Sequence, residues 1–365
     1  MLSGAKKYIL MFRNTLLRIL LLPFSLVYGF FAILNNLMYD AKIINPIKFT
    51  IPVISVGNLT VGGTGKTPHT EYLINLLKPY IKLAVLSRGY KRKSKGFREV
   101  LPTDDVTGAG DEPLLYKRKY PDIKVFVAED RVEGISKMLM EDPGIQTVIL
   151  DDAFQHRTVA PAINILLTEY DQPFYKDFFL PSGRLREWRS GYKRADIIIV
   201  SKCPVNISQN DRDAFIKKIK PLNNQKVFFS YYKYFNPYYI YDPTQRKSLN
   251  SNTSVLLISA LASTSYLINY LQQNTGDLHS LEFTDHHNFT YDEMLQFKKI
   301  FDNISNPDKI ILTTEKDAMR LDMHRDFIIK NRLPVYILPV AVDFLFDQKV
   351  QFDDTIKQYL LDFKS

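Results

Sequence analysis

The sequence contains a single cysteine, Cys203, among its 365 residues. It can form no intrachain disulfide, and nothing in it points to an oxidising compartment. Internal repeats and low-complexity segments are absent as well, and 45% hydrophobic with 24% charged residues is typical of a globular protein. Acidic residues are outnumbered, 39 against 48 Lys and Arg, which leaves a formal charge of +9. This excess predicts an anionic partner: nucleic acid, a phosphate-bearing substrate or a membrane surface.

Charge is missing from one stretch near the N-terminus, Ile19–Leu34. A helix over 15–37 would be about 34 Å long at roughly 1.5 Å per residue, enough to cross a bilayer core of about 30 Å. No small-residue cleavage site follows, which disfavours a cleaved signal peptide. Pro23, Gly29 and two asparagines favour a shallow, partly embedded helix over a spanning one. A helix packed on its own domain is the alternative.

After about residue 45, short aliphatic runs alternate with helical stretches. Continuous apolar runs are typical of strands buried on both faces, and their alternation with helices indicates a parallel α/β sheet. An aromatic segment, 227–243, indicates extended strands or a hinge between two such sets. The expected strands are 51–56, 81–86, 124–128, 147–150, 163–167 and 196–201, followed by 254–261, 278–283, 309–314 and 333–340.

The stretch TVGGTGKT follows the first of these runs and precedes a helical pattern. Glycines let backbone N–H groups approach an anion, and the helix N-terminus adds partial positive charge. In such a loop Lys66 would reach the β- and γ-phosphates and the Thr67 hydroxyl would ligate Mg²⁺. The strict consensus has glycine at position 60. The predicted phosphate-binding residues are Thr60, Gly62, Gly63, Thr64, Gly65, Lys66 and Thr67.

Three further motifs carry acidic or imidazole groups. The run TVILDD ends in Asp151 and Asp152, either of which would hold the metal, because Mg²⁺ prefers oxygen ligands. In GAGDEP, Asp111 either caps a helix or accepts a proton from a substrate hydroxyl. In FTDHHNFT, His286 lies in a loop before a capping box, Thr290 to Glu293, and either is an ordinary surface histidine or orients a base.

Two basic stretches, 87–98 and 183–194, suit either nucleic acid or lipid headgroups. The apolar N-terminal helix makes an anionic lipid surface the more economical interpretation, and no nucleic acid is expected. Ordinary solvated loops are the alternative for both stretches.

Together these motifs resemble the tetraacyldisaccharide 4'-kinase family, the kinases of lipid A biosynthesis. Ala153 and Thr284 replace the family's usual glycine and proline, and neither change removes a functional group. The motifs that carry the resemblance are VGNLTVGGTGKTPH, SRGY, GDEP, AEDR, LDDAFQHR, LPSGRLRE, TDHH and TTEKDA, in the expected order from about residue 50 to 320.

The resemblance implies an α/β fold with three parts: a membrane-associated helix (1–40), a P-loop NTPase-like kinase core (41–228) and a smaller C-terminal α/β domain that begins with hinge strands (229–365). It implies transfer of the γ-phosphoryl of ATP to the 4'-hydroxyl of tetraacyldisaccharide 1-phosphate, with Mg²⁺, at the cytoplasmic face of the bacterial inner membrane. A P-loop kinase for a soluble hydroxyl substrate is the alternative.

The resemblance also implies roles for single residues. Asp111 and His286 would form a catalytic dyad that activates the hydroxyl. It assigns no clear role to Glu315–Lys316–Asp317. The remaining implied residues are Arg131 and Gln155 at the phosphates, Asp151 or Asp152 with Thr67 at the metal, and Arg88, Glu112, His156 and Glu187 on the substrate side.

Overall fold

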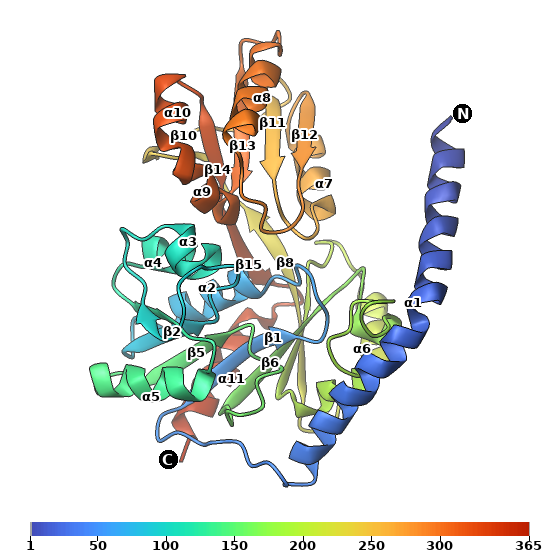
Figure 1. Cartoon of the computed structure of the whole chain (residues 1–365), viewed down its shortest axis with the longest axis vertical. Coiled ribbons are helices and arrows are strands. Elements are labelled where there is room, and N and C mark those ends of the chain that lie inside the picture. Colours follow the sequence, from blue (N-terminus) through green and yellow to red (C-terminus); the bar gives the residue numbers. More distant parts are fainter. Residues whose placement is uncertain (1, 365) are drawn as a thin grey trace. The chain divides into compact units, whose positions relative to one another are not determined.

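The computed structural model describes residues 2–364, and the side chains from residue 19 onward (Figure 1). The chain forms two compact units that interleave along the sequence. The first contains the segment up to Lys66, Leu150–Tyr231 and the segment from Phe344; the second contains Thr67–Ile149 and Tyr232–Asp343. The predicted three-part division at 40 and 228 stays a prediction.

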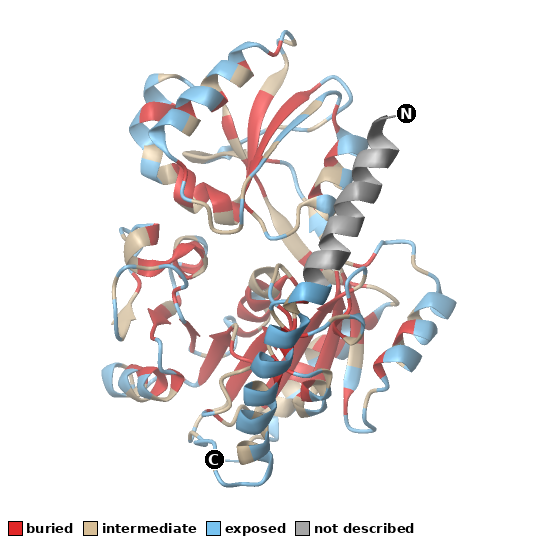
Figure 2. Ribbon diagram, turned by 45° about the vertical axis from the view of Figure 1, so that its right-hand side comes forward, coloured by how far each residue is buried: buried red, intermediate tan, exposed pale blue. Residues whose placement is uncertain are grey.

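A parallel sheet forms the core of the first unit. Its hydrogen-bonded strands are β1 (Val53–Asn58), β6 (Ile163–Glu169), β7 (Ile197–Ser201) and β8 (Lys226–Tyr234). Every residue of β1, β6 and β7 is buried, as expected of strands covered on both faces (Figure 2). The helices are α6 (Gln209–Ile219), which begins at a Ser208–Asp211 capping box, and α11 (Gln348–Leu361), with short turns η1 (Phe174–Lys176) and η2 (Arg189–Arg194).

The second unit begins with the helix that follows the glycine-rich loop. In this part β2 (Leu83–Ser87) pairs parallel with β4 (Lys124–Val127), and β3 (Arg98–Glu99) pairs antiparallel with β4. The chain passes from this unit into the first within β5 (Thr147–Asp151). The helices are α2 (Lys66–Leu77), α3 (Val106–Ala109), α4 (Asp111–Lys119) and α5 (Arg131–Glu141).

A six-stranded sheet forms the rest of the second unit, in the order β10-β9-β14-β13-β11-β12. β11 (Ser254–Ser259), β12 (Leu278–Glu282), β13 (Lys309–Thr314) and β14 (Val335–Leu338) are parallel, while β9 (Tyr238–Tyr239) and β10 (Asp242–Arg246) are antiparallel. The helices are α7 (Ser265–Asn274), α8 (Tyr291–Asp302), α9 (Glu315–Leu321), η3 (Asp322–His324) and α10 (Arg325–Lys330).

These elements confirm the α/β class, the parallel strands and the Thr290–Glu293 capping box. One expected strand, 333–340, is wrong as a single element. It is divided into β14 and β15 (Val340–Phe344) on either side of Pro339. Proline has no N–H to donate, so it interrupts the pairing of a continuous strand.

The N-terminal helix α1 (Leu2–Asp40) contacts the rest of the first unit through small and polar residues. The Ser25 hydroxyl donates to the carbonyl of Phe179 (3.1 Å), and a Cβ at Gly29 would come within 2.7 Å of the Phe179 ring. Asn36 donates to Glu187 at 3.1 Å. Most of the helix from Ile19 onward is exposed (Figure 2), and the exposed residues include large apolar ones. Ile19–Asp40 is long and apolar enough to cross a membrane by length and composition.

Candidate active site

The glycine-rich loop connects β1 to α2, which is the predicted strand–loop–helix context. Gly62 and Gly65 have φ of 115° and 89°, a region that glycine adopts without strain. The carbonyl of Thr64 accepts from the Ser201 hydroxyl at 2.7 Å, which ties the loop to the end of β7. Lys66 is the first residue of α2, so the loop delivers the lysine at a helix N-terminus.

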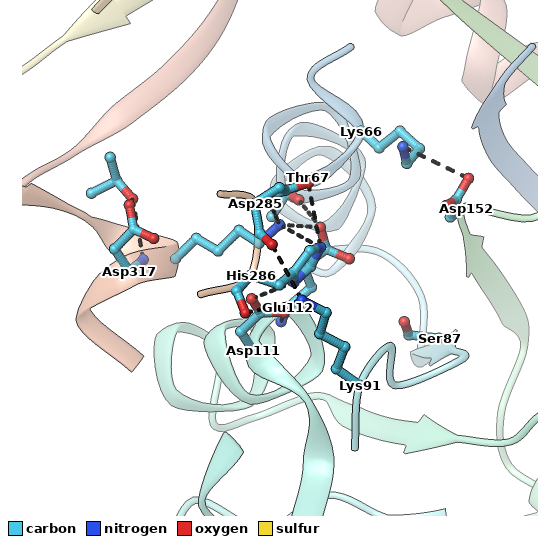
Figure 3. Close-up of polar contacts among 12 residues, drawn as sticks. Lys66, Thr67, Ser87, Lys91, Asp111, Glu112, Asp152, Asp285, His286 and Asp317 are labelled. Atoms are coloured by element: carbon cyan, nitrogen blue, oxygen red, sulfur yellow. Dashed lines mark hydrogen bonds and ion pairs between the residues drawn. The ribbon is translucent and has the colours of Figure 1, made fainter. Parts of the chain in front are cut away.

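Lys66 faces two oxygen-bearing side chains from the carboxyl ends of strands. Its Nζ is 3.7 Å from Asp152 Oδ1 (Figure 3) and 3.5 Å from Asn58 Oδ1. Arg186 joins the same group, with Nη2 2.8 Å from Asp152 Oδ1 and in contact with Asn58 Oδ1. Neither Asn58 nor Arg186 was predicted. Asn58 lies two residues after the apolar run 51–56 and Arg186 lies directly before Glu187, and both fall within motifs that carry the family resemblance.

The two predicted metal carboxylates follow the buried strand β5. Asp151 is its last residue and is 1% exposed. Asp152 has a left-handed φ of 48°, so the chain turns sharply after the strand and its carboxylate reaches Lys66 and Arg186. Two acids on a buried strand end thus lie in the unit that also holds the glycine-rich loop.

Gln155 and Glu187, both predicted for the site, contact each other. Gln155 Nε2 donates to Glu187 Oε1 at 2.9 Å and to the carbonyl of Asn58 at 2.8 Å. Glu187 is buried, and Arg194 Nη1 lies 2.8 Å from its Oε2. Asn36 of α1 donates to the same carboxylate, so the N-terminal helix reaches this cluster.

His156 lines a separate cavity of the first unit, with a volume of about 310 Å³. Arg157 and Asp196 also line it, together with Ser55 and Asn164, which are neighbours across β1 and β6. The predicted substrate-side role of His156 stays a prediction.

In the second unit, Asp111 begins α4 and is 5% exposed. Gly110, with φ of 88°, occupies the N-cap position, so the interpretation of Asp111 as a simple helix cap is wrong. A Cβ at Gly110 would lie 3.1 Å from the Cα of Gly89, so the glycine also allows close backbone contact. This tight approach places the Asp111 carboxylate at the start of the helix.

The structure brings Asp111 and His286 together, with Oδ2 of Asp111 2.8 Å from Nδ1 of His286 (Figure 3). His286 has a left-handed φ of 58°, and its ring packs against Tyr90 with centroids 4.8 Å apart. Lys91 Nζ donates to the His286 carbonyl at 3.3 Å. The SRGY segment therefore supports the imidazole rather than being an isolated basic loop.

The electrostatic surroundings keep Asp111 ionised. Burial acts to raise the pKa of this carboxyl, but the hydrogen bond from His286 and the charges of Lys316 and Arg320 outweigh it. The pKa of Asp111 is therefore lowered well below its usual range. A charged carboxylate is the form that can hold and polarise an imidazole.

Glu112 links the start of α2 to α9. Its Oε1 accepts from the Thr67 hydroxyl at 3.3 Å and lies 3.2 Å from Lys316 Nζ. Arg320 of the same helix donates to Asp111. Lys316 and Arg320 were not assigned from the sequence; the TTEKDA segment that follows β13 was the available signal.

The remaining predicted residues lie elsewhere in the second unit. Arg131 is the buried first residue of α5 and donates to the carbonyl of Ala128. Arg88 is exposed directly after β2. Their phosphate and substrate roles stay predictions.

A glycine-rich loop with its lysine at a helix start and acids at a strand end are typical of P-loop nucleotide-binding proteins, and a buried carboxylate–imidazole pair can take a proton from a hydroxyl, as in a kinase. The family model described as tetraacyldisaccharide-1-P 4'-kinase matches residues 17–361. The chain belongs to the tetraacyldisaccharide 4'-kinase family and is a kinase.

Members of this family are similar to the chain over nearly its whole length. The tetraacyldisaccharide 4'-kinase of Phocaeicola vulgatus is 43% identical over 347 residues, which cover 93% of this chain and 94% of that protein. The tetraacyldisaccharide 4'-kinase of Flavobacterium johnsoniae is 40% identical over 345 residues, which cover 94% of this chain and 98% of that protein. A crystal structure of LpxK from Aquifex aeolicus in complex with ATP matches with a TM-score of 0.70 at 28% identity, over 94% of this chain and 99% of that one.

Proposed function

We propose that the chain transfers the γ-phosphoryl of ATP to the 4'-hydroxyl of tetraacyldisaccharide 1-phosphate, a step of lipid A biosynthesis. The observation that carries the proposal is the 2.8 Å contact between Asp111 and His286 in a chain with a phosphate loop. A nucleotide-dependent switch or a binding module needs no such pair. A kinase that activates a hydroxyl does.

The nucleotide is held by the loop between β1 and α2. Its backbone N–H groups surround the β- and γ-phosphates, and Lys66 neutralises charge that develops during transfer. Thr60, Gly62, Gly63, Thr64, Gly65 and Thr67 form the rest of this cradle. Arg131 and Gln155 are the further residues that we assign to phosphate contact.

The chain offers oxygen donors that could bind magnesium. Thr67, Asp151 and Asp152 offer a hydroxyl and carboxylates, the oxygen donors that Mg²⁺ prefers. Across the described part of the chain, no group of three or more His, Cys, Asp or Glu residues forms a metal cage. When bound, magnesium neutralises charge on the β- and γ-phosphates.

The acceptor hydroxyl is activated by the dyad. His286 and Asp111 supply an imidazole whose orientation is fixed by a charged carboxylate. Arg88, Glu112, His156 and Glu187 contact the sugar-phosphate part of the acceptor. A soluble alcohol would leave the exposed apolar face of α1 without a role.

We assign α1 to the membrane interface, at the cytoplasmic face of the bacterial inner membrane. Its contacts with the folded unit extend from Ser25 to Asn36, so this face of the helix lies along the protein. The other sides carry exposed Phe24, Phe30 and Phe31. A helix with one protein-bound face and large apolar residues elsewhere suits a shallow position in the lipid.

Glutamates in place of Phe24 and Phe31 are expected to release the chain from lipid vesicles. The two phenylalanines, 66% and 63% exposed, would lose about 3 kcal/mol or more of apolar burial in the bilayer. Co-sedimentation with vesicles of anionic lipid measures the effect. The matched control, Tyr80→Glu, changes an exposed aromatic residue outside α1 and should sediment like the parent. Equal sedimentation of all three proteins would show that α1 is not the anchor.

The direct test of the function uses the purified full chain in detergent, [γ-³²P]ATP, Mg²⁺ and tetraacyldisaccharide 1-phosphate. Label is expected in the lipid and not in glucosamine 1-phosphate, a soluble acceptor. Label in the soluble sugar alone would favour the alternative kinase. Transfer to neither acceptor would contradict the proposal.

A further inference from the structure

One face of α9 carries two cations that contact the two members of the dyad. Lys316 and Arg320 are four residues apart, so their side chains lie on the same side of the helix. Lys316 Nζ is 3.2 Å from His286 Nε2, and Arg320 Nη1 donates to Asp111 Oδ2. The helix therefore touches both the far nitrogen of the imidazole and its carboxylate partner.

The contact from Lys316 fixes where the imidazole proton lies. An ammonium group can only donate a hydrogen bond, so Nε2 of His286 is the acceptor. The imidazole proton then lies on Nδ1, which donates to Asp111 Oδ2 at 2.8 Å. The second oxygen of Asp111 accepts from the Glu112 backbone N–H at 2.9 Å. Both carboxylate oxygens are thus engaged by donors, and Nε2 is the dyad atom that carries a lone pair, which accepts from Lys316 in this structure.

Lys316 is itself held in place as a cation. Its Nζ lies 3.2 Å from Glu112 Oε1 and 3.5 Å from Asp285 Oδ1. Burial alone would lower the pKa of Lys316, but the charges of Glu112, Asp111 and Asp285 outweigh it and raise that pKa. The ammonium therefore stays protonated and keeps donating to His286.

The helix that carries the two cations is anchored at both ends. Lys119 of α4 lies 2.7 Å from Glu315 at the start of α9, and Arg118 lies 2.8 Å from Asp322 just after it. Within α9, Arg320 also contacts Asp317, which accepts from the backbone N–H of Ala260 at 3.1 Å. A rigid support of this kind is what a precisely oriented catalytic pair requires.

We propose that Lys316 and Arg320 are positioning residues of the phosphoryl transfer, with Lys316 keeping His286 in the tautomer that accepts a proton at Nε2 and Arg320 holding Asp111 beneath it. This inference rests on the proposed function, which supplies the acceptor hydroxyl. In the reaction the acceptor hydroxyl takes the place of the Lys316 ammonium at Nε2, and its proton passes to Nε2 as the hydroxyl oxygen bonds to the γ-phosphorus. The bond from that phosphorus to the β–γ bridging oxygen breaks, and ADP leaves.

Lys316→Met is expected to lower kcat about 10- to 100-fold, the usual cost of losing a group that orients a reacting side chain. The KM for ATP should change by less than about threefold, because the lysine acts through His286 and not on the nucleotide. Lys316→Arg should recover part of the lost kcat, since a guanidinium also donates to Nε2. Lys247→Met, which removes a lysine paired with Asp308 in the same unit, is the matched control and should keep the parental kcat.

The tautomer of His286 gives a readout that a merely structural role would not move. The full chain, with ¹⁵N-labelled histidine in detergent, has six imidazoles, and the spectrum of His286→Gln identifies the relevant one. The parent should show a protonated Nδ1 and a bare Nε2. In Lys316→Met the two nitrogens should move towards an averaged mixture of tautomers, while Lys247→Met should match the parent.

Two results would overturn the assignment. One is parental kcat in Lys316→Met. The other is a lowered kcat with the His286 tautomer unchanged, which would make Lys316 a structural residue only. Arg320→Lys, which keeps the charge but loses the planar fork of donors, should also lower kcat; parental kcat in this variant would exclude Arg320 as a positioning residue. The tautomer measurement needs no acceptor, so its outcome is separate from any failure of the proposed function.

Discussion

Asp111→Asn is expected to lower kcat by about three orders of magnitude, the range that loss of general base catalysis produces. The asparagine keeps the shape of the side chain and can still accept from Nδ1 of His286 through its amide oxygen, but it carries no charge. The imidazolium that forms when Nε2 takes the hydroxyl proton then loses the carboxylate that stabilises it. The KM for ATP should stay near the parental value, because the lost interaction is made in the transition state.

The control for this variant is Asp308→Asn, which removes a charged partner of Lys247 in the same unit. It should turn over like the parent. Asp111→Asn also removes the charged partner of Arg320 and could lower the stability of the fold. The thermal unfolding temperatures of both variants therefore show whether a lost activity comes from the chemistry or from unfolding. A well-folded Asp111→Asn protein with parental kcat would exclude Asp111 from the reaction.

Lys66→Met is expected to lower kcat/KM for ATP about 100- to 1,000-fold. Lys66 would neutralise charge on the terminal phosphates, and removal of one such group typically costs this much. The fold should tolerate the change, because Arg186 still pairs with Asp152 when the lysine is gone. Lys66→Arg should not restore activity, since the planar guanidinium is a poor replacement for a compact ammonium in a tight loop.

The matched control is Lys82→Met, which removes an exposed lysine that pairs with Asp142. Steady-state kinetics with ATP varied at a fixed acceptor concentration compare the variants. If Lys66→Met and Lys82→Met give the same kcat/KM, the loop between β1 and α2 does not hold the reacting phosphates.

The parts of the fold with a local signal could be predicted. The run IPVISV indicated β1 because continuous apolar residues suit a strand buried on both faces. The capping box at Thr290 indicated the start of α8 for an equally local reason. The division of 333–340 at Pro339 was not predicted, because the apolar pattern continues through this proline. The absence of an N–H group on proline is the local signal that indicates the break.

The candidate site shows the limit of such reasoning. Asp111 and His286 are 175 residues apart, and only the family resemblance joined them. Arg320 is 209 residues from Asp111, and no periodic or local sequence pattern indicates that the two side chains are in contact. Arg186 and Asn58 were missed for the same reason, since polar side chains that meet across a fold need no shared spacing. Chemistry could be inferred from motifs, whereas the support around the reacting groups required coordinates.

The position of the new phosphate tests the proposed reaction most directly. Lipid product from the full chain, ATP and tetraacyldisaccharide 1-phosphate would be analysed by ¹H–³¹P correlation. A second phosphorus signal coupled to the 4'-proton is the predicted result. A phosphate on any other oxygen of the lipid, or release of inorganic phosphate with the lipid unchanged, would contradict transfer to the 4'-hydroxyl.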